Sequence, residues 1–311
     1  MTRAVVFAYH NVGVRCLSVL LAGHVEVPLV VTHDDSADEN IWFDSVAALA
    51  EEHSIPFVTP DDPNRPDVIE RIRNLAPEFI FSFYYRRMLG AELLACASRG
   101  ALNMHGSLLP KYRGRAPVNW AVLKGETQTG ASLHYMEIKP DAGALVDQQA
   151  VPILPDDIAL DVFNKVTWAA ELVLYRSLPL LITGQAPGQP LNLKEGSYFG
   201  GRRPEDGVID WRENAETIHN LIRSVAPPYP GAFSRLDSLP MRILRSQLDR
   251  EPARHPDRAP CFYWERGRCY ADCSDGRRLH IGKFEVEGQS MTPEAFHTRY
   301  GEQIKDLGQP R

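Results

Sequence analysis

Long hydrophobic runs are absent from the sequence: none approaches the roughly 20 apolar residues that a membrane-spanning helix needs. Residues 1–7 run directly into an expected strand, unlike the start of a cleaved targeting segment. The 311 residues are 44% hydrophobic and 24% charged, which excludes a disordered or fibrous chain and allows two domains. We therefore expect a cytoplasmic globular protein with no membrane partner.

Cysteine and blocks of one charge are also scarce. The five cysteines are an odd number spread over a long chain, which makes a poor disulfide framework. Cys269 and Cys273 lie four residues apart, but no second close Cys or His pair completes a tetrahedral zinc site, so no metal is expected. Acidic and basic residues are mixed, with a formal net charge of −6 and no long Lys/Arg block, which disfavours a nucleic-acid partner.

Short apolar runs alternate with helix-like segments in the first half of the chain. The expected strands are residues 4–8, 26–32, 57–59, 79–83, 101–104, 132–138 and 145–153, and the expected helices are residues 13–22, 41–53, 67–75, 90–97 and 158–181. This alternation predicts an α/β, Rossmann-like domain with a mostly parallel sheet. Residues 8–13 contain one glycine where a dinucleotide fingerprint needs three, so an NAD enzyme is disfavoured.

The composition of the sequence changes near residues 184–203, where Gly, Pro and Gln become frequent, and this predicts a domain boundary. Beyond it we expect a helix at residues 215–225 and short strands at residues 232–236, 241–247, 262–265, 268–273 and 278–285. These predict a small β-rich domain that forms an OB-like barrel. The domains are thus expected at residues 1–203 and 204–311, with the polar residues after Tyr300 loosely ordered.

Polar residues stand at the end of the expected strand 101–104. Residues two apart in a strand face the same side, so Asn103 and His105 present a carboxamide and an imidazole to one point. An amide can donate to a developing oxyanion, and an imidazole can exchange the proton of an attacking amine. Asp141, in a turn between two expected strands, can reach the imidazole, fix its tautomer and raise its pKa. A purely structural histidine, and an aspartate that only stabilises its own turn, stay open as alternatives.

These residues also carry a resemblance to a known family. Asn103, His105, the Ser-Leu-Leu-Pro that ends at Pro110, and the segments 113–115 and 141–143 resemble the signature of 10-formyltetrahydrofolate-dependent formyltransferases. Residues 6–10, 81–86, 105–117 and 199–206 look most like the formyltransferase half of the bifunctional UDP-4-amino-4-deoxy-L-arabinose enzymes of lipid A modification. Those proteins continue into a dehydrogenase domain that this sequence does not contain.

The resemblance implies roles for individual residues. Asn103 would stabilise the tetrahedral transition state, His105 would handle the proton, and Asp141 would raise the pKa of His105. The contacts to the folate would come from Arg87, Met88, Leu89, Arg115, Glu137, Ile138, Lys139, Pro140 and Asp141. Tyr84, Tyr85, Arg202 and Arg203 are weaker predictions for stacking on a uracil or holding a diphosphate.

The implied reaction is transfer of a formyl group from 10-formyltetrahydrofolate, as co-substrate, to the amine of a nucleotide-linked amino sugar such as UDP-4-amino-4-deoxy-L-arabinose. A methionyl-tRNA formyltransferase is the main alternative, but the acidic net charge argues against it. A non-catalytic nucleotide-sugar-binding protein of the same fold is a second alternative, disfavoured because all three polar residues are present. A homo-oligomer stays open, and His10, His134 and His219 are given no catalytic role.

Overall fold

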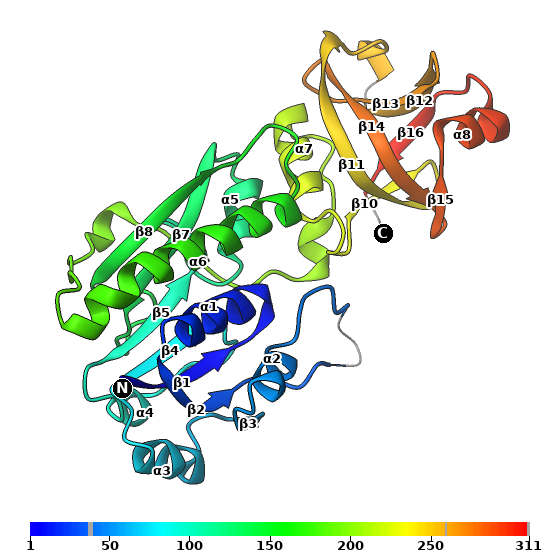
Figure 1. The fold of residues 1–311 in the computed structure, drawn as a ribbon. Helices are drawn as coiled ribbons and strands as arrows, with labels where there is room; N and C mark the ends of the chain where they lie inside the picture. The colour runs from blue at the N-terminus through cyan, green and yellow to red at the C-terminus, as the bar shows by residue number, and fades with distance from the viewer. Residues whose placement is uncertain (37–39, 259, 310–311) are drawn as a thin grey trace. The chain divides into compact units, whose positions relative to one another are not determined.

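The computed structural model describes residues 1–36, 40–258 and 260–309. The chain divides into two compact units. The first unit comprises Met1–Pro117, Gln128–Val151 and Phe163–Gly200, and the second comprises Val118–Thr127, Pro152–Val162 and Gly201–Arg311. Neither unit is therefore one continuous stretch of sequence (Figure 1).

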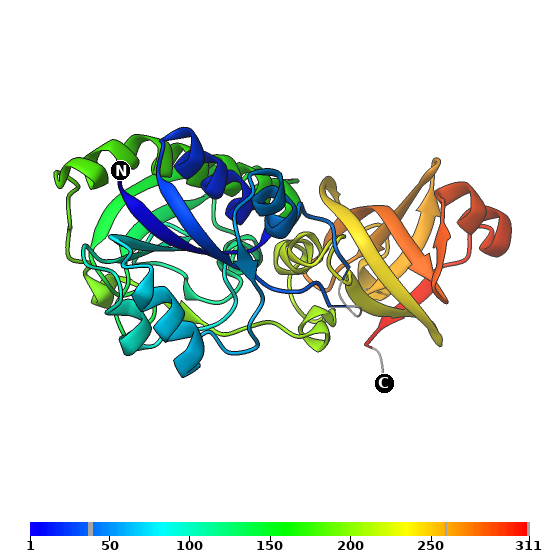
Figure 2. The same ribbon diagram turned by 60° about the horizontal axis from the view of Figure 1, so that its bottom comes forward.

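The first unit is built around a sheet whose strands alternate with helices, as predicted. Its elements are β1 (Arg3–Ala8), α1 (His10–Ala22), β2 (Glu26–Val31), α2 (Val46–Glu52), β3 (Phe57–Val58), α3 (Pro66–Asn74), β4 (Phe79–Phe83), α4 (Ala91–Leu94), β5 (Ala101–His105), β6 (Arg113–Gly114), β7 (Gln128–Tyr135), β8 (Leu145–Pro152), α6 (Ala159–Thr183), η1 (Leu193–Glu195) and β9 (Tyr198–Phe199). Helix α5 (Pro117–Leu123) follows β6, and all but its first residue belong to the second unit. Helices α1 and α6 cover one face of the sheet, and α3 and α4 cover the other (Figure 2).

The strand order in this sheet is β3-β2-β1-β4-β5-β7-β8. Strands β1 to β5 pair in parallel, whereas β7 runs antiparallel to β5. All five residues of β4 are buried, because both faces of a parallel sheet are covered by helices. The prediction of a Rossmann-like, mostly parallel sheet is confirmed. Strand β4 lies between β1 and β5, so the carboxyl ends of these three parallel strands share the edge of the sheet where the polar residues gather.

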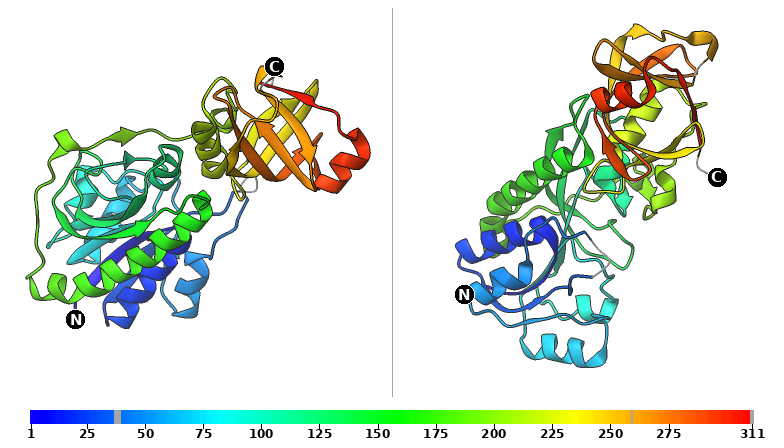
Figure 3. Two further views of the ribbon diagram at one scale, coloured as in Figure 1. Left: turned by 90° about the horizontal axis from the view of Figure 1, so that it is seen from above. Right: turned by 90° about the vertical axis from the view of Figure 1, so that its right-hand side faces the viewer.

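The second unit contains an antiparallel barrel. Its elements are η2 (Pro204–Gly207), α7 (Ala215–Ser224), β10 (Ala232–Leu236), β11 (Leu239–Pro252), η3 (Pro256–Arg258), β12 (Cys261–Glu265), β13 (Arg268–Asp272), β14 (Arg277–Val286), β15 (Gln289–Met291), α8 (Pro293–Tyr300) and β16 (Lys305–Gly308). The strand order is β11-β10-β16-β12-β13-β14-β15, and an additional pairing of β11 with β14 closes the ring. The right-hand view in Figure 3 shows how these strands curve around one another. The predicted barrel is confirmed.

Several predicted bounds are wrong for identifiable reasons. The helix expected at residues 41–53 begins only at Val46, where the side chain of Ser45 accepts from the backbone N–H of Ala48 and caps it. The strand expected at 132–138 begins earlier, at Gln128, and ends at Tyr135. Of the residues after Tyr300, which were expected to be loosely ordered, Lys305–Gly308 form strand β16, which pairs with both β10 and β12. Within the described residues, no helix combines the length and the apolar character needed to cross a membrane.

Candidate functional site

The pairing of β5 with β7 sets the geometry of the polar site. Asn103 lies opposite His134, and His105 lies opposite Ser132. Since residues two apart share a face of a strand, Asn103 and His105 point to one side, as predicted, and His134 joins them from the neighbouring strand. Asn103 is partly exposed, whereas His105 is only 6% exposed.

Asp141 reaches this face from the turn between β7 and β8. Its Oδ1 atom lies 3.6 Å from His105 Nδ1, 3.5 Å from His134 Nε2 and 3.4 Å from Asn103 Nδ2. Its Oδ2 atom accepts the backbone N–H of Gly114 at 2.9 Å. The backbone of Asp141 is left-handed, with φ of +49°, a conformation that costs free energy and is frequently found at functional sites. The structure thus brings together the three residues predicted to be catalytic.

The hydrogen bond of His105 to Tyr112 fixes its tautomer. His105 Nε2 lies 2.8 Å from the carbonyl oxygen of Tyr112, and a carbonyl can only accept, so Nε2 carries the hydrogen. In the neutral ring, Nδ1 is therefore the basic atom, and it faces Asp141. The backbone of Tyr112 is also left-handed, with φ of +57°, which aims this carbonyl at the imidazole.

Burial has the largest effect on the pKa of His105. It lowers that pKa because a charged imidazole is poorly solvated in the interior, while Asp141 and the Tyr112 carbonyl raise it by a smaller amount. The net pKa is below 6.5. Asp141 acts on the pKa of His105 in the predicted direction, although burial outweighs the carboxylate and leaves the net pKa lowered.

Asp141 itself stays ionised over a wide pH range. Burial raises its pKa, but His105, His134 and the Gly114 N–H together lower it more. The result is a pKa well below the ordinary value of 3.8. A carboxylate at this point is thus a permanent negative charge beside the imidazole.

The amide of Asn103 keeps one hydrogen available. Its Nδ2 atom lies 3.2 Å from His134 Nε2 and 3.4 Å from Asp141 Oδ1, which are themselves 3.5 Å apart. The two acceptors therefore subtend about 60° at Nδ2, half the angle between the two hydrogens of a planar amide. One N–H can therefore serve both acceptors, which leaves the other available to a ligand.

His134 is a residue of this site that the sequence analysis missed. Its Nδ1 atom lies 2.8 Å from the carbonyl oxygen of Tyr135, so Nδ1 carries the hydrogen and Nε2 accepts from Asn103. The signal was present in the sequence, since Ser132 and His134 alternate along a strand. Finding it required the register of β7 against β5, which the sequence does not state.

The segment between β5 and β6 is held by its own hydrogen bonds. Ser107 Oγ donates to the carbonyl of Lys111, and Ser132 Oγ donates to the carbonyl of Ser107. Gly114 has φ of +97°, and a Cβ there would lie 2.2 Å from the carbonyl oxygen of Phe199. Only glycine fits this position, which places the N–H that Asp141 accepts.

Of the residues predicted to contact the folate, Glu137, Ile138 and Lys139 line an open hollow of about 440 Å³. It is lined by Ala91, Leu94, Met136, Glu137, Ile138 and Lys139. The side chains of Met88 and Ile138 are exposed by 56% and 76%, which is unusual for apolar residues. Leu89 is buried, and the carbonyl of Met88 accepts from Asn64. Arg87 and Arg115 are exposed, and Pro140 is partly exposed.

The residues predicted to contact the nucleotide are divided between the two units. Tyr85 is 9% exposed, and its ring stacks on His33 with centroids 4.2 Å apart. That ring belongs to the core and is not available to a base, so the stacking prediction for Tyr85 is wrong. Tyr84 is partly exposed and has φ of +57°, and its ring packs edge-on against Phe163.

Arg202 and Arg203 belong to the second unit, whereas Tyr84 and Tyr85 belong to the first. Arg202 lies over the ring of Trp120 at 5.0 Å and donates to the carbonyl of Asp206. Burial lowers the pKa of Arg202, with Asp206 opposing that effect. Arg203 is exposed, and its backbone N–H donates to Asp206 Oδ2. These contacts lie at the start of η2, and a ligand role for Arg202 and Arg203 stays a prediction.

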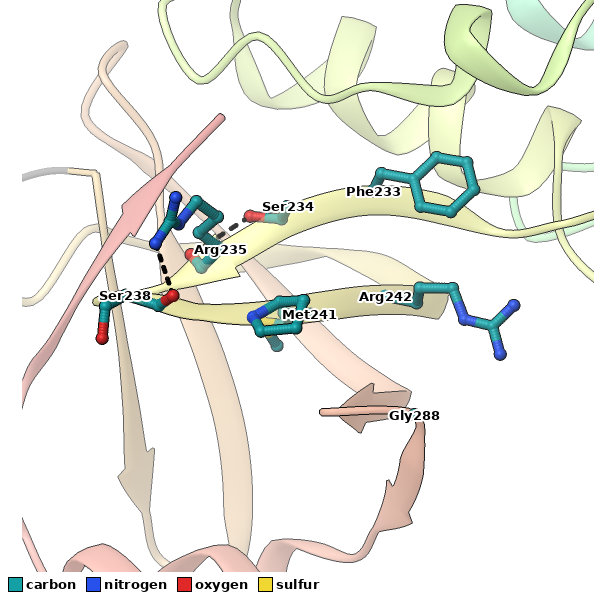
Figure 4. Close-up of a pocket in the computed structure, with 8 residues that line it drawn as sticks. Phe233, Ser234, Arg235, Ser238, Met241, Arg242 and Gly288 are labelled. Atoms are coloured by element: carbon teal, nitrogen blue, oxygen red, sulfur yellow. Dashed lines mark hydrogen bonds between the residues drawn. The ribbon is translucent and has the colours of Figure 1, made fainter. Parts of the chain in front are cut away.

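A further hollow, of about 390 Å³, lies on the barrel (Figure 4). Phe233 and Arg242 stand at one end of it, and Arg235 and Ser238 stand at the other. Its lining contains no carboxylate, imidazole or thiol, so it offers no group for proton transfer near neutral pH. Among the described residues there is also no cluster of His, Cys, Asp and Glu that could hold a metal ion.

Comparison with known proteins agrees with this geometry. Residues 10–178 match the family model described as formyl transferase, and residues 202–301 match the model described as formyl transferase, C-terminal domain. The chain is similar to the N-formyltransferase from Helicobacter canadensis, solved with folinic acid and dTDP-3-aminofucose, with 21% identity, coverage of 94% of this chain and 100% of that chain, and a TM-score of 0.71.

Two other solved structures share the fold. WlaRD, a sugar 3-N-formyltransferase solved with dTDP and 5-N-formyl-tetrahydrofolate, is 19% identical over 94% of this chain and 98% of that chain, with a TM-score of 0.71. A sugar N-formyltransferase from a Shewanella species is 17% identical over 75% of this chain and 92% of that chain, with a TM-score of 0.60. With a family match over more than half of its length, the chain belongs to the formyl transferase family.

Proposed function

We propose that the protein transfers a formyl group from 10-formyltetrahydrofolate to the amine of a nucleotide-linked amino sugar. The observation that carries the proposal is the convergence of Asn103, His105 and Asp141 at the carboxyl end of β5. Family membership and the similar structures that hold a folate with a dTDP-linked ligand support it. The assignment of all three residues to catalysis is part of the proposal.

His105 acts as the base at its Nδ1 atom. The Nε2–H is committed to the Tyr112 carbonyl, so Nδ1 takes the proton from the attacking amine. The imidazolium that results faces the charge of Asp141, 3.6 Å away, which stabilises it. The same nitrogen then returns the proton to the leaving nitrogen. Because burial lowers the pKa of His105, the ring is neutral and ready at neutral pH.

Asn103 stabilises the negative charge that develops on the formyl oxygen. The N–H that it shares between His134 and Asp141 holds the amide plane, and the other N–H is the donor to the oxygen. The orientation is fixed before the substrates arrive, which is what makes such a donor effective.

The folate is proposed to bind at the hollow beside residues 136–139. Exposed apolar side chains, Met88 and Ile138, suit a planar ring system, and Arg115 suits the negatively charged tail of a folate. The backbone of residues 87–89 lies in the loop after β4, where the resemblance places the pterin contacts.

The acceptor is proposed to be UDP-4-amino-4-deoxy-L-arabinose, which places the enzyme in lipid A or lipopolysaccharide modification and hence in antibiotic resistance. The resemblance of residues 105–117 and 199–206 supports this choice. A dTDP-linked amino sugar is the second candidate, because the similar structures were solved with dTDP-3-aminofucose and with dTDP.

A formyl-transfer assay with a panel of acceptors tests the proposal. The purified protein, supplied with 10-formyltetrahydrofolate, is offered a UDP-linked 4-amino sugar, a dTDP-linked 3-amino sugar and initiator methionyl-tRNA. We expect turnover with one of the nucleotide sugars, and a loss of about 10²–10⁴-fold in turnover for His105→Ala. His53→Ala, on the surface at the end of α2, serves as the matched control. Turnover with the tRNA alone, or full activity of His105→Ala, would contradict the proposal.

A further inference from the structure

Arg113, the first residue of β6, is a buried guanidinium without a carboxylate partner. It is 9% exposed, and its Nε atom is shielded and donates to no atom in the described parts of the chain. Among those same residues its side chain makes no ion pair, and its one ring contact is with Tyr198, 6.0 Å away. A guanidinium in this state is costly, because its Nε has lost water without a hydrogen-bond partner and the group has gained no counter-charge.

The two other buried arginines among the described residues have partners for their guanidinium groups, although Arg278 Nε, like Arg113 Nε, makes no hydrogen bond. Arg278 is 6% exposed and lies within 2.9–3.3 Å of carboxylate oxygens of Asp249, Glu251 and Glu265. Arg223, also 6% exposed, donates to Asn220 Oδ1 and to the carbonyl of Asp157. Arg113, whose side chain has neither an ion pair nor a hydrogen bond among the described residues, differs from both of these arginines.

Arg113 lies between two residues that hold the catalytic groups. The carbonyl of Tyr112 accepts from His105, and the N–H of Gly114 donates to Asp141. Asp141 makes no ion pair with Arg113 in the part of the chain that is described, because its oxygens face the other side-chain groups of the site. Lys111 and Arg115 are exposed and likewise have no carboxylate partner among the described residues, so none of the three basic side chains of this segment is ion-paired there.

We propose that Arg113 binds an anionic group of a substrate. A guanidinium presents a fork of donors that matches a phosphate or a carboxylate, and an anion bound there supplies the missing counter-charge. The inference rests on the proposed function, which offers two sources of such a group: the diphosphate of a nucleotide sugar and the glutamate carboxylates of a folate.

Binding and melting measurements on Arg113→Met test the inference. The probes are inorganic pyrophosphate and UDP for the first source, and p-aminobenzoyl-glutamate for the second, each titrated by calorimetry. We expect wild-type protein to bind the probes of one source and Arg113→Met to bind them about 10–100-fold more weakly. Without ligand, we expect Arg113→Met to melt about 2–4 °C higher, because an unpaired buried charge has been removed. Arg113→Lys keeps the charge but not the fork, and is expected to fall between the two in affinity.

Arg278→Met is the matched control, since it makes the same change at a buried and paired arginine. It is expected to lower the melting temperature and to leave probe binding unchanged. A wild-type protein that binds none of the probes would overturn the inference, as would an Arg113→Met that melts lower or binds as tightly as wild type. The probes do not react, so their binding is independent of turnover. An acceptor panel that fails while the probes still bind through Arg113 refutes the proposed function alone.

Discussion

Replacement of Asp141 by asparagine removes one charge and almost no volume, and it separates the role of the carboxylate from that of the fold. Asp141 Oδ1 faces His105 Nδ1 at 3.6 Å, and Oδ2 accepts the Gly114 N–H. An asparagine oxygen can still accept from Gly114, so the turn is expected to survive. What is lost is the charge that stabilises the protonated imidazole when the amine gives up its proton.

The expected loss follows from the burial of this group. The Asp141 side chain is only 13% exposed, and breaking a buried pair by removing one charge costs about 3–5 kcal/mol. We take the lower end, about 3 kcal/mol, because the shape and the Gly114 hydrogen bond are kept. At 1.36 kcal/mol for each factor of ten, Asp141→Asn is expected to lower kcat by roughly 10²–10³-fold. The KM for the folate is expected to change little, since the hollow at residues 136–139 keeps its lining.

An NMR titration of His105 separates an electrostatic role of Asp141 from a merely structural one. Asp141 raises the pKa of His105, so its removal must lower that pKa further below 6.5. The ring nitrogen shifts are expected to show hydrogen on Nε2 in both proteins, because the Tyr112 carbonyl is unchanged. Asp67→Asn, at an exposed ion pair with Arg65, is the matched control for activity. A His105 pKa that rises or stays the same in Asp141→Asn would refute the reasoning.

Three further outcomes are expected. His134→Leu removes an acceptor that orients Asn103, so kcat should fall about tenfold, a loss near 1–1.5 kcal/mol. His134→Gln, whose side-chain oxygen can still accept, should restore most of the activity. Equal turnover by the wild type and both variants would contradict the assignment. Gly114→Ala forces a Cβ against Phe199 at a left-handed backbone, and it is expected to lower the free energy of unfolding in urea by about 1–3 kcal/mol. Gly282→Ala, where a Cβ would meet open space, is expected to leave that free energy nearly unchanged. Stability should fall with acid in two steps. The first, below about pH 6.5, arises because burial lowers the pKa values of His105, His219 and His280, and the second, below about pH 4, arises because Asp141 has a lowered pKa. His105→Gln should make the first step smaller in unfolding curves measured at several pH values, and an unchanged first step would contradict this.

The elements predicted well from the sequence are those whose signal is local. Strand β4 has its predicted bounds, because an unbroken apolar run is what a strand buried on both faces requires. The alternation of Asn103 and His105 on one face also follows from strand geometry alone. Helix α5 was missed because it is short and starts at Pro117, directly after an irregular basic segment. Strand β16 was missed because its residues are mostly polar and gain their order from β10 and β12.

The parts of the site that were missed depend on pairing across the chain. His134 enters through the antiparallel register of β7 against β5, which no single segment encodes. The direction of the His105 pKa depends on burial, and burial depends on every element packed around β5. Tyr85 looked like a ligand-binding aromatic because its neighbours are basic, yet its ring lies against His33 and Phe7. Sequence pattern gave the chemistry of the polar residues, and packing decided which of them are accessible.

The division of the chain bears on how this protein can be dissected. Residues 118–127 and 152–162 belong to the second unit, although residues 128–151 and 163–200 return to the first. A fragment ending near residue 200 would carry pieces of the second unit without their partners, and the complementary fragment would lack those same pieces. Proteolytic clipping or genetic splitting at that point should yield two damaged halves, and the barrel should not be exchangeable as a cassette between relatives.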